Sequence, residues 1–438
     1  ICAVYLAAGS GGVAFCDVST GEFCCADFPN DPAAHIVNEL GRFAPKEAVL
    51  SPGAADDGQI YEFIVKKLGA MAEAGTEAFE YMPACVRVCR QFGFTDIDEA
   101  GLGESSAAVC ASGALLAYIA ETQKFDLSHI DRLDVFGGGR YMEMDWTTRR
   151  SLELTESLRS GEKRGSLLWV LDKTRTPMGG RMLRAWVERP LLSVLAIKRR
   201  LAAVNELYRD NVTRGELIEA LREISDMQRL VARCVYGTAG GRDLRTLSNC
   251  IAALPRLREL LSAFHCVELR EIGSMDILGD VRTVIDGAIC DDPPFSVREG
   301  GVIRAGYNQE VDYLRNIRDN GAQMVTDLET RERERTGIKK LKVGYNKVFG
   351  YFIDIPRSAG LENVPEDYIR KQTLVSNERY ITQELKELES TLLNARERIN
   401  ELEYRLFAEI RDCVAGQVDR EKSTADAVAR LDCLCSLA

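Results

Sequence analysis

The chain has 438 residues, of which 46% are apolar and 28% are charged. This composition is ordinary for folded protein and supplies core material for about two to four domains of roughly 100–200 residues each. No apolar run approaches the roughly 20 residues that a membrane-spanning helix requires, so we expect no membrane partner. The net charge of −11 argues against a nucleic-acid surface that covers the whole chain.

The cysteines indicate a reducing compartment and neither disulfides nor a metal site. The chain holds 14 Cys and only three His, and no two Cys have the CxxC spacing that structural zinc sites use. Most of the Cys stand among apolar residues, as do Cys16, Cys110 and Cys250. We therefore predict reduced, buried thiols, no metal and a cytoplasmic protein.

Neither end of the chain looks like a natural terminus. Ile1 lies inside a predicted strand, follows no initiator Met and begins no secretory signal. The other end, Ala438, follows the apolar stretch Leu431–Leu437. We expect the chain to be cut from a longer protein.

Charge is distributed unevenly along the chain. Residues 1–112 hold six Lys/Arg and 16 Asp/Glu, so this part carries a charge of −10 and the rest of the chain about −1. By contrast, residues 331–347 hold seven basic residues and two acidic ones. A short basic segment in an acidic chain indicates a focused contact with an anionic partner.

Residues 1–112 are predicted to form an α/β domain. Strands at Ala3–Ala7 and Val13–Cys16 are expected to join through a hairpin turn at Gly9–Gly12. Asp17 follows the second strand, but no other carboxylates converge on a matching strand end, so its segment is interpreted as a turn and not as a nuclease site. The other elements expected here are the strands Phe23–Phe28 and Glu47–Ser51 and the helices Pro32–Arg42 and Ile60–Leu68.

Helical periodicity dominates from Ser106 to Leu278, and residues 113–305 are assigned to a helical domain. The first helix expected is Ser106–Thr122, and a strand-like link, Leu133–Met144, follows it. The remaining helices expected are Trp146–Leu154, Leu167–Leu171, Met178–Glu188, Val194–Asn205, Arg214–Leu221, Met227–Tyr236, Asp243–Leu254 and Met275–Ile285.

Two long helical arms are predicted over residues 306–395, and residues 396–438 are assigned to a helix that returns to the helical domain. The first arm covers about Tyr307–Arg335, and at 1.5 Å per residue an arm of about 30 residues is roughly 45 Å long. The second arm carries an unbroken heptad of apolar residues, which is typical of a helix packed along a partner. Its members are Ile381, Leu385, Leu388, Leu392, Ala395, Ile399, Leu402 and Leu406.

A small sheet is predicted between the arms. The segments Lys339–Val343 and Phe349–Ile355 alternate apolar and polar residues and are expected to be strands joined by a turn at Gly344–Lys347. Ile369–Leu374 is a candidate third strand. The basic segment therefore lies at the end of the two arms.

Four stretches of the chain carry a family resemblance. They are ERERTGIKKLKVGYNKVFGYFIDIPRSAGLENVPEDYIRKQTLVSNERYITQELKELE (Glu332–Glu389), YMEMDWTTRRSLEL (Tyr141–Leu154), LDKTRTPMGGRMLRAWVERPL (Leu171–Leu191) and FCDVSTGEF (Phe15–Phe23). These stretches resemble the clamp, lever and connector of the MutS family of DNA mismatch repair proteins, and the resemblance covers essentially the whole chain. It implies a multidomain fold with an α/β, ribonuclease H-like connector, followed by a mostly α-helical lever with long antiparallel coiled-coil arms that carry a small β-containing clamp.

The resemblance also implies function and partners. The clamp is expected to hold duplex DNA by its phosphates without reading sequence, and the lever to couple the clamp to a C-terminal ATPase. A homodimer of the full-length protein and a MutL-type partner on the connector are expected as well. The implied DNA contacts are Lys339, Lys340, Lys342, Tyr345, Asn346, Lys347, Arg370, Lys371, Gln372 and Arg379, with Arg335 as a weaker candidate.

Two parts of the family pattern are missing from this chain. No GxxxxGK[ST] phosphate loop occurs, and the mismatch-reading domain with which family members begin is also absent. We therefore expect no catalytic site and no cofactor in this chain, with ATP and Mg²⁺ bound by an ATPase domain of the longer protein.

Two other hypotheses stay open at this point. The chain is also compatible with a divergent MutS homologue that acts in recombination, because the mismatch-reading domain separates the two branches. It is also compatible with a coiled-coil scaffold whose basic tip binds an acidic protein. Competition by duplex DNA distinguishes the scaffold from a DNA clamp.

Overall fold

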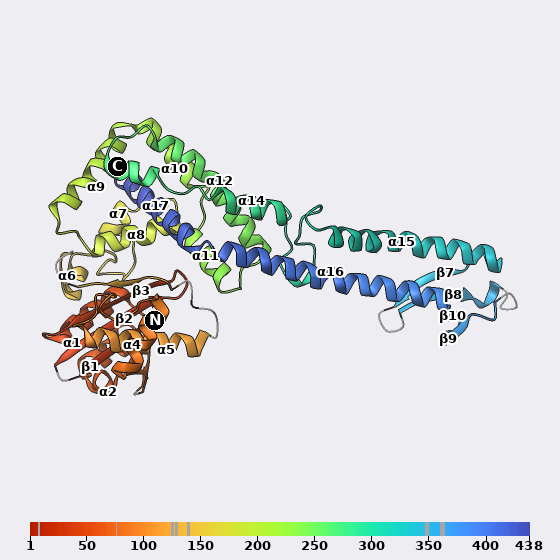
Figure 1. Cartoon of the computed structure of the whole chain (residues 1–438), viewed down its shortest axis with the longest axis horizontal. Helices are drawn as coiled ribbons and strands as arrows, with labels where there is room; N and C mark the ends of the chain where they lie inside the picture. The colour runs from red at the N-terminus through yellow and green to blue at the C-terminus, as the bar shows by residue number, and fades with distance from the viewer. Residues whose placement is uncertain are drawn as a thin grey trace. The chain divides into compact units, whose positions relative to one another are not determined.

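The computed structural model describes residues 1–7, 9–75, 77–123, 127, 130–137, 141–346, 350–359 and 364–438, without the side chains of 322, 359, 391–393 and 396. The chain divides into two compact units (Figure 1). The first unit comprises Ile1–Ala239, Asp243–Ile285 and Arg411–Ala438, and the second comprises Gly240–Arg242 and Asp286–Ile410. In the described part of the chain, no helix combines the length and the apolar character that crossing a membrane requires.

The first unit begins with a six-stranded mixed sheet in the order β5-β4-β1-β2-β3-β6. Its strands are β1 (Cys2–Ala7), β2 (Ser10–Asp17), β3 (Glu22–Phe28), β4 (Glu47–Leu50), β5 (Met71–Ala74) and β6 (Leu133–Val135). Strands β1, β2 and β3 are antiparallel neighbours, whereas β4, β5 and β6 join the sheet in parallel pairs. Both faces are covered by apolar clusters, so the run Val13–Cys16 of β2 is buried throughout.

The helices of this sheet domain are α1 (Pro32–Phe43), α2 (Pro52–Asp56), α3 (Gly58–Glu62), which continues as a π-helical turn Phe63–Lys67, α4 (Tyr81–Phe92) and α5 (Ser106–Gln123). The domain boundary predicted at residue 112 falls inside α5. Because Leu115, Leu116 and Ile119 of α5 pack into the sheet core, the whole helix belongs to the α/β domain. The sequence did not indicate α4 or β5, since only Ala84 and Val88 of α4 are buried and β5 is largely exposed.

The hairpin turn predicted at Gly9–Gly12 is shorter than expected. Strand β2 begins at Ser10, so Gly11 and Gly12 lie inside a strand. A Cβ atom on Gly12 would lie 2.2 Å from the backbone carbon of Ala107 in α5. Glycine is therefore needed at this position for the close approach of the helix to the sheet.

The link predicted as strand-like over Leu133–Met144 forms a strand only at β6. Further along, Tyr141 makes an isolated bridge to Leu191 and the Met142 N–H donates to the Pro190 carbonyl at 2.8 Å, so the described end of the link contacts the segment that follows residue 188. The helices that follow are α6 (Trp146–Ser151), α7 (Leu167–Leu171), α8 (Pro177–Glu188), α9 (Val194–Arg209), α10 (Asn211–Leu221), α11 (Met227–Val235), α12 (Gly241–Leu261), α13 (Val267–Gly273), α14 (Gly279–Ala288) and α17 (Val418–Leu437).

Helix α12 continues through Pro255, although the sequence predicted that the helix would end just before this proline. The helix was expected to stop at Leu254, yet it continues through Pro255 to Leu261. Leu254, Leu257 and Leu261 are all buried, so tertiary packing compensates for the backbone hydrogen bond that proline removes.

A buried carboxylate explains the Thr-Pro-Met-Gly motif at the start of α8. Asp432 of α17 accepts hydrogen bonds from the Thr176 N–H and hydroxyl, both at 2.7 Å, and from the Arg175 N–H. Thr176 in turn caps α8, and a Cβ atom on Gly179 would lie 2.3 Å from the Asp432 carboxylate. The motif therefore joins the first turn of α8 to α17.

The second unit consists mainly of two long helices and a four-stranded sheet. Helix α15 (Gln309–Thr336) packs against α16 (Gln383–Ala415) through Val311, Leu314, Ala395, Ile399 and Leu402. Glu403 of α16 is fully buried, pairs with Arg315 of α15 at 2.7 Å and accepts a hydrogen bond from the Val302 N–H. The return helix runs to Ala415, beyond the predicted end of the heptad.

The antiparallel sheet of the second unit has the order β7-β8-β10-β9. Its strands are β7 (Lys342–Asn346), β8 (Gly350–Pro356), β9 (Ile369–Thr373) and β10 (Asn377–Ile381). Gly344–Asn346 were predicted as a turn but pair with β8, and Ile381, predicted as the first residue of the heptad, ends β10. One face of the sheet packs Ile353, Ile355 and Tyr380 against Leu328 and Leu385 of the two helices.

Candidate nucleic-acid interface

The structure brings nine of the ten predicted contact residues to the four-stranded sheet and the turn before it. Strands β7 and β9 are the two edges of this sheet. The residues on β7 are Lys342, Tyr345 and Asn346, those on β9 are Arg370, Lys371 and Gln372, Arg379 is on β10, and Lys339 and Lys340 lie between α15 and β7. Lys347 lies outside the described residues.

The lysines of this surface are exposed and have no acidic partner. Lys339, Lys340, Lys342 and Lys371 are all exposed, and within the described residues none lies within ion-pair distance of a carboxylate. Arg370 is also exposed and stands 3.7 Å from Glu378. We call the four lysines together with Arg370 the basic tip.

The carboxylates of the same sheet are engaged by internal partners. Asp354 accepts a hydrogen bond from the Asn377 side chain at 2.6 Å, and Glu378 accepts one from the Tyr380 hydroxyl at 2.7 Å. That hydrogen bond lowers the pKa of Glu378, while burial raises the pKa of Tyr380 to about 12. Asp354 and Glu378 therefore have partners inside the sheet, whereas the four lysines of the basic tip have no acidic partner among the described residues.

Arg379 occupies a different environment from the lysines. Its guanidinium lies over the Phe352 ring at 4.1 Å, donates to the Gln372 side chain at 3.0 Å and stands 3.7 Å from Asp354. The pairing of β9 with β10 shifts register next to Arg379, and Lys371 is left without a partner in the register. A bulge of this kind redirects a side chain, and here the redirected residue is an exposed lysine.

The remaining predicted residues differ in exposure. Tyr345 is 53% exposed and packs against Tyr351 with ring centroids 5.0 Å apart, whereas Asn346 is half-buried. The weaker candidate Arg335 forms two hydrogen bonds to Asp367, at 2.6 and 2.7 Å. Arg357, which is not among the predicted contacts, follows β8, is 47% exposed and lies 3.5 Å from Glu378. The only sequence signal for it was a basic residue directly after a strand.

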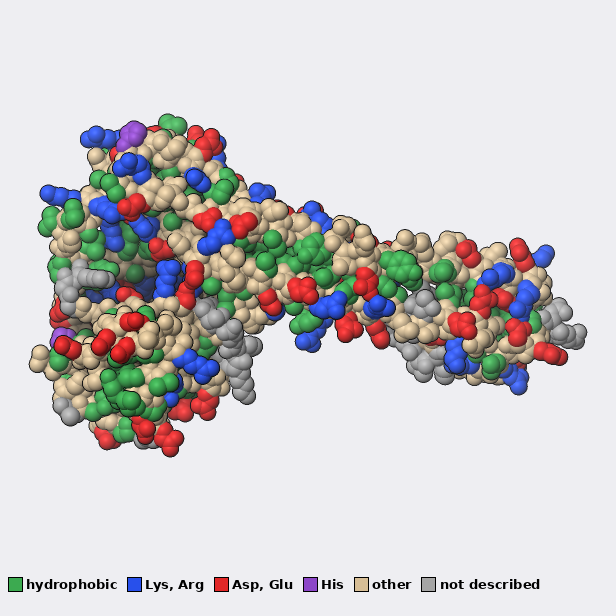
Figure 2. All heavy atoms as spheres, viewed as in Figure 1, with side chains coloured by type: hydrophobic (Ala, Val, Ile, Leu, Met, Phe, Trp, Pro, Cys, Tyr) green, Lys and Arg blue, Asp and Glu red, His purple; other side chains and the backbone are tan. Residues whose placement is uncertain are grey.

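The face shown in Figure 2 carries blue and red side chains side by side around β7–β10, so the positive charge is local. On the α/β domain, Asp and Glu side chains gather along the lower edge of the view. This distribution agrees with the charge pattern of the sequence, in which the first 112 residues are strongly acidic.

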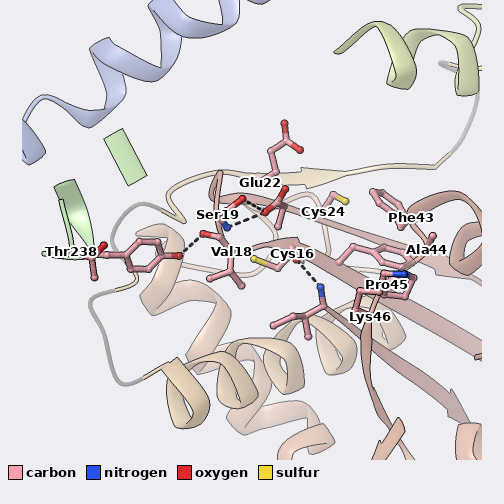
Figure 3. A pocket seen from close by; sticks show the side chains of 14 residues that line it. Cys16, Val18, Ser19, Glu22, Cys24, Phe43, Ala44, Pro45, Lys46 and Thr238 are labelled. Atoms are coloured by element: carbon pink, nitrogen blue, oxygen red, sulfur yellow. Dashed lines mark hydrogen bonds between the residues drawn. The ribbon is translucent and has the colours of Figure 1, made fainter. Parts of the chain in front are cut away.

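A cavity of about 680 Å³ lies beside the end of β2 in the first unit (Figure 3). It is lined by Cys16, Asp17, Glu22 and Lys46, among others, and Tyr236 of the helical part donates a hydrogen bond to the Val18 carbonyl at its edge. Asp17 accepts hydrogen bonds from the Ser19 N–H at 2.9 Å and the Ser19 hydroxyl at 2.7 Å. The Asp17 carboxylate thus closes the turn after β2, as the sequence predicted.

An acidic α/β domain, a helical domain and a helix pair that carries a small basic sheet together define a multidomain class of protein. Comparisons with known families identify the class: the model of MutS domain II matches residues 1–131, and the model of MutS domain III matches residues 147–438. The chain therefore belongs to the MutS family, as the resemblance of its motifs predicted.

Curated relatives agree with this assignment. The DNA mismatch repair protein MutS of Symbiobacterium thermophilum is 44% identical over 431 residues, which cover 98% of this chain and 49% of the relative. The MutS proteins of Acetivibrio thermocellus and Caldicellulosiruptor bescii are 43% and 39% identical, and cover 98% and 100% of this chain and 49% of each relative. The chain spans about half the length of the curated relatives it matches.

Proposed function

We propose that the chain forms the connector, lever and clamp of a MutS-type mismatch repair protein, and that its basic tip holds the backbone of duplex DNA without reading sequence. The observation that carries the proposal is the contrast within one small sheet. Its carboxylates have internal partners, whereas Lys339, Lys340, Lys342 and Lys371 have none among the described residues. Free lysines bind phosphates as point charges and are insensitive to base sequence.

The spacing of the sheet supports a contact with both strands of a duplex. Strands β7 and β9 are separated by three strand spacings, which corresponds to about 14 Å. The major groove of DNA has a width of about 12 Å. Lysines on the two edges of the sheet can therefore reach phosphates on both sides of one groove.

The finer parts of the proposal rest on the family and on the charge distribution. The helix pair α15 and α16, packed as coiled-coil arms, is proposed to couple the tip to an ATPase domain that binds ATP and Mg²⁺. The acidic connector, proposed to be ribonuclease H-like, is assigned to a MutL-type partner because its charge makes it a poor DNA contact. Homodimerisation around DNA and a cytoplasmic location complete the proposal.

Charge reversal at the tip tests the DNA contact. The variant K339E/K340E/K342E is expected to lose most affinity for duplex DNA, measured by fluorescence anisotropy over a range of salt concentrations. If three phosphate contacts are lost, the slope of log K against log salt should flatten by about 2.7. Substituting mismatched for matched duplex should not change the affinity of the chain, because backbone contacts carry no sequence information.

The matched control is K67E/K173E/K198E, which changes the net charge by the same amount at exposed lysines of the first unit. It is expected to keep the slope of the unmodified chain. If the two triple variants had equal slopes of log K against log salt, the basic tip would not be the DNA contact. Tip-dependent binding of an acidic protein that duplex DNA fails to displace would favour the scaffold hypothesis. A MutS homologue of recombination is disfavoured by the relatives, whose names all describe mismatch repair.

A further inference from the structure

A second cavity, of about 280 Å³, lies in the first unit between α1, the link after β6 and the end of α8. Its lining includes Arg42 of α1, Phe136 of the link, Arg149 of α6 and Arg189 after α8. The link belongs to residues 132–146, which fall between the two segments matched by the family models. We call this cavity the arginine pocket.

Three guanidinium groups of the arginine pocket have buried N–H groups without a hydrogen-bond partner in the described part of the chain. The atoms are Nη2 of Arg42, Nε of Arg149 and Nη2 of Arg189. The Arg42 side chain is only 8% exposed, so water does not easily satisfy it. Buried donors normally have partners. One buried acceptor of the lining, Oε2 of Glu39, also lacks a hydrogen-bond partner there, so the three donors outnumber it and could serve a further acceptor.

The carboxylates near these arginines do not supply enough acceptors. Oε2 of Glu39 lies 2.6 Å from Nη1 of Arg42 and 3.9 Å from Nη2 of Arg189, so one carboxylate oxygen faces two guanidinium groups without forming a hydrogen bond to either. Glu188 accepts a hydrogen bond from Arg184 at 3.0 Å, and Arg184 is not part of the lining. Burial lowers the pKa of Arg42 to about 10, so Arg42 keeps its charge at neutral pH. The floor of the pocket is therefore positively charged.

The rim of the pocket has the opposite charge. Asp134, Glu143 and Asp145 line it and are exposed. Asp145 also caps α6, where its carboxylate accepts a hydrogen bond from the Thr148 N–H. These three carboxylates disfavour the entry of a dianion such as phosphate, whereas an anion with one charge is repelled less.

Aromatic rings form the other part of the lining. The Arg42 and Arg189 guanidinium groups lie over the Phe136 ring, at 4.7 and 4.5 Å from its centroid. The Phe28 and His35 rings stack on each other with centroids 5.3 Å apart. When the face of a guanidinium stacks on an aromatic ring, the N–H groups at its edge point away from the ring. They can then form the paired hydrogen bonds that match a carboxylate.

From these observations we propose that the arginine pocket is a binding site for a small monocarboxylate with a flat apolar body. The carboxylate would accept the orphaned N–H groups of Arg42, Arg149 and Arg189, and the body would pack among Phe28, Phe136 and Met142. Because these arginines come from α1, α6 and the end of α8, an occupied pocket would hold the α/β domain and the first lever helices together. The proposal is independent of the DNA contact at the basic tip.

Benzoate is a suitable probe, with benzamide as its uncharged analogue of the same shape. Ligand-observed NMR and calorimetry on the chain should show saturable binding of benzoate, and benzamide should bind at least about tenfold more weakly because it lacks the charge. The variant R189Q should weaken benzoate binding by at least about tenfold, and R189K should lie between R189Q and the unmodified chain. The melting temperature of the chain should rise with benzoate concentration.

R200Q is the matched control, because Arg200 also stacks on an aromatic ring, at 3.7 Å from Trp186, but does not line the pocket. Its benzoate affinity should equal that of the unmodified chain. Non-saturable benzoate binding, equal binding of benzamide, equal losses in R189Q and R200Q, or tighter binding of inorganic phosphate would each overturn the proposal. The comparison of benzoate with benzamide needs no variant, so it remains decisive even if R189Q folds poorly.

Discussion

The six-stranded sheet of the first unit and the four-stranded sheet of the second are covered to different extents. Helices and apolar clusters cover both faces of the first, so a strand such as β2 is buried along most of its length. The second sheet packs one face against α15 and α16 and leaves the other face to Lys342, Asp354 and Arg379. The first sheet serves as a core, and the second presents a charged surface.

The comparison shows how one chain with a net charge of −11 can contain a site for an anion. In the second unit, the carboxylates near the sheet are bound by tyrosine, asparagine or arginine side chains, and lysines are left over. In the first unit, α17 instead buries a carboxylate with no partner among the described residues, that of Glu421. The distribution of partners, and not the number of charges, decides where an anion can bind.

The largest expected effect comes from making the same change, Glu to Gln, in both units. Burial raises the pKa of Glu421 to about 8, so the folded state holds a proton that the unfolded state releases near its ordinary pKa. The free energy of unfolding therefore falls as pH rises from about 4.5 to 8. In E421Q this fall is absent, because the glutamine side chain does not titrate. With a cost of about 1 kcal/mol for the buried amide, we expect E421Q to gain about 3 kcal/mol at pH 8 and to lose about 1 kcal/mol below pH 4.5.

E378Q should have the opposite effect. The Tyr380 hydrogen bond lowers the pKa of Glu378, so its contribution to stability is present above the ordinary pKa and is lost as pH falls. At neutral pH we expect E378Q to lose stability locally. Hydrogen exchange of peptides from α17 and β10, corrected for its intrinsic pH dependence, measures both effects. Changes of the same sign in the two units would contradict the comparison.

A medium effect is expected from adding one methyl group to each sheet. In G12A the new Cβ would meet the backbone of Ala107 at 2.2 Å, whereas in G344A it would meet the Phe352 ring edge at 3.0 Å. Backbone cannot move aside as a side chain can, so we expect losses of about 3 kcal/mol for G12A and below about 1 kcal/mol for G344A. Urea unfolding followed by hydrogen exchange in each unit tests the order.

G58A is the control for this pair, because a Cβ atom on Gly58 would meet nothing within 4 Å. It should leave stability unchanged or slightly raised, since alanine favours the helix that begins there. A loss in G58A as large as that in G12A would show that the glycine backbone, and not the close packing of α5, causes the effect.

The smallest effect is expected at two arginine–aspartate pairs. Arg181 of the first unit binds both oxygens of Asp226, at 2.6 and 2.9 Å, with its side chain 29% exposed. Arg335 of the second unit also donates to both oxygens of Asp367, but through Nη2 alone, and its side chain is 44% exposed. We expect R181M to cost about 1–2 kcal/mol and R335M below about 0.5 kcal/mol, measured by thermal unfolding. Equal losses of stability in R181M and R335M would show that the exposure of the arginine does not determine how much each pair contributes.

Much of the fold could be predicted because its signals are local. Periodicity alone located α5, α8 and the two long helices to within a few residues at most of their ends, since an apolar stripe specifies a helix wherever it packs. Charge counting located the basic tip, because consecutive lysines in a short segment stay together in any fold. The family resemblance then supplied a partner for the tip.

Other features depended on contacts between residues far apart in sequence. Gly12 was taken for a turn because its need for glycine comes from α5, nearly 100 residues later, and Pro255 was taken for a helix end because its compensation comes from tertiary packing. The sequence listed Arg379 and Lys342 as equivalent cations, yet only folding placed Arg379 over Phe352 and beside Asp354. The arginine pocket draws Arg149 and Arg189 from two of the family-like stretches, yet nothing in those stretches indicated that Arg42 lies beside them.

The sequence by itself determined the helical arms, the uneven distribution of acidic and basic residues and the family of this protein. Each of these properties depends on residues that are close together in the chain. The tertiary structure decided which charges are free. A carboxylate or guanidinium is neutralised, orphaned or exposed according to what lies within a few ångströms of it, and at that range the partners of Asp432, Glu403 and Arg42 are contributed by distant parts of the chain.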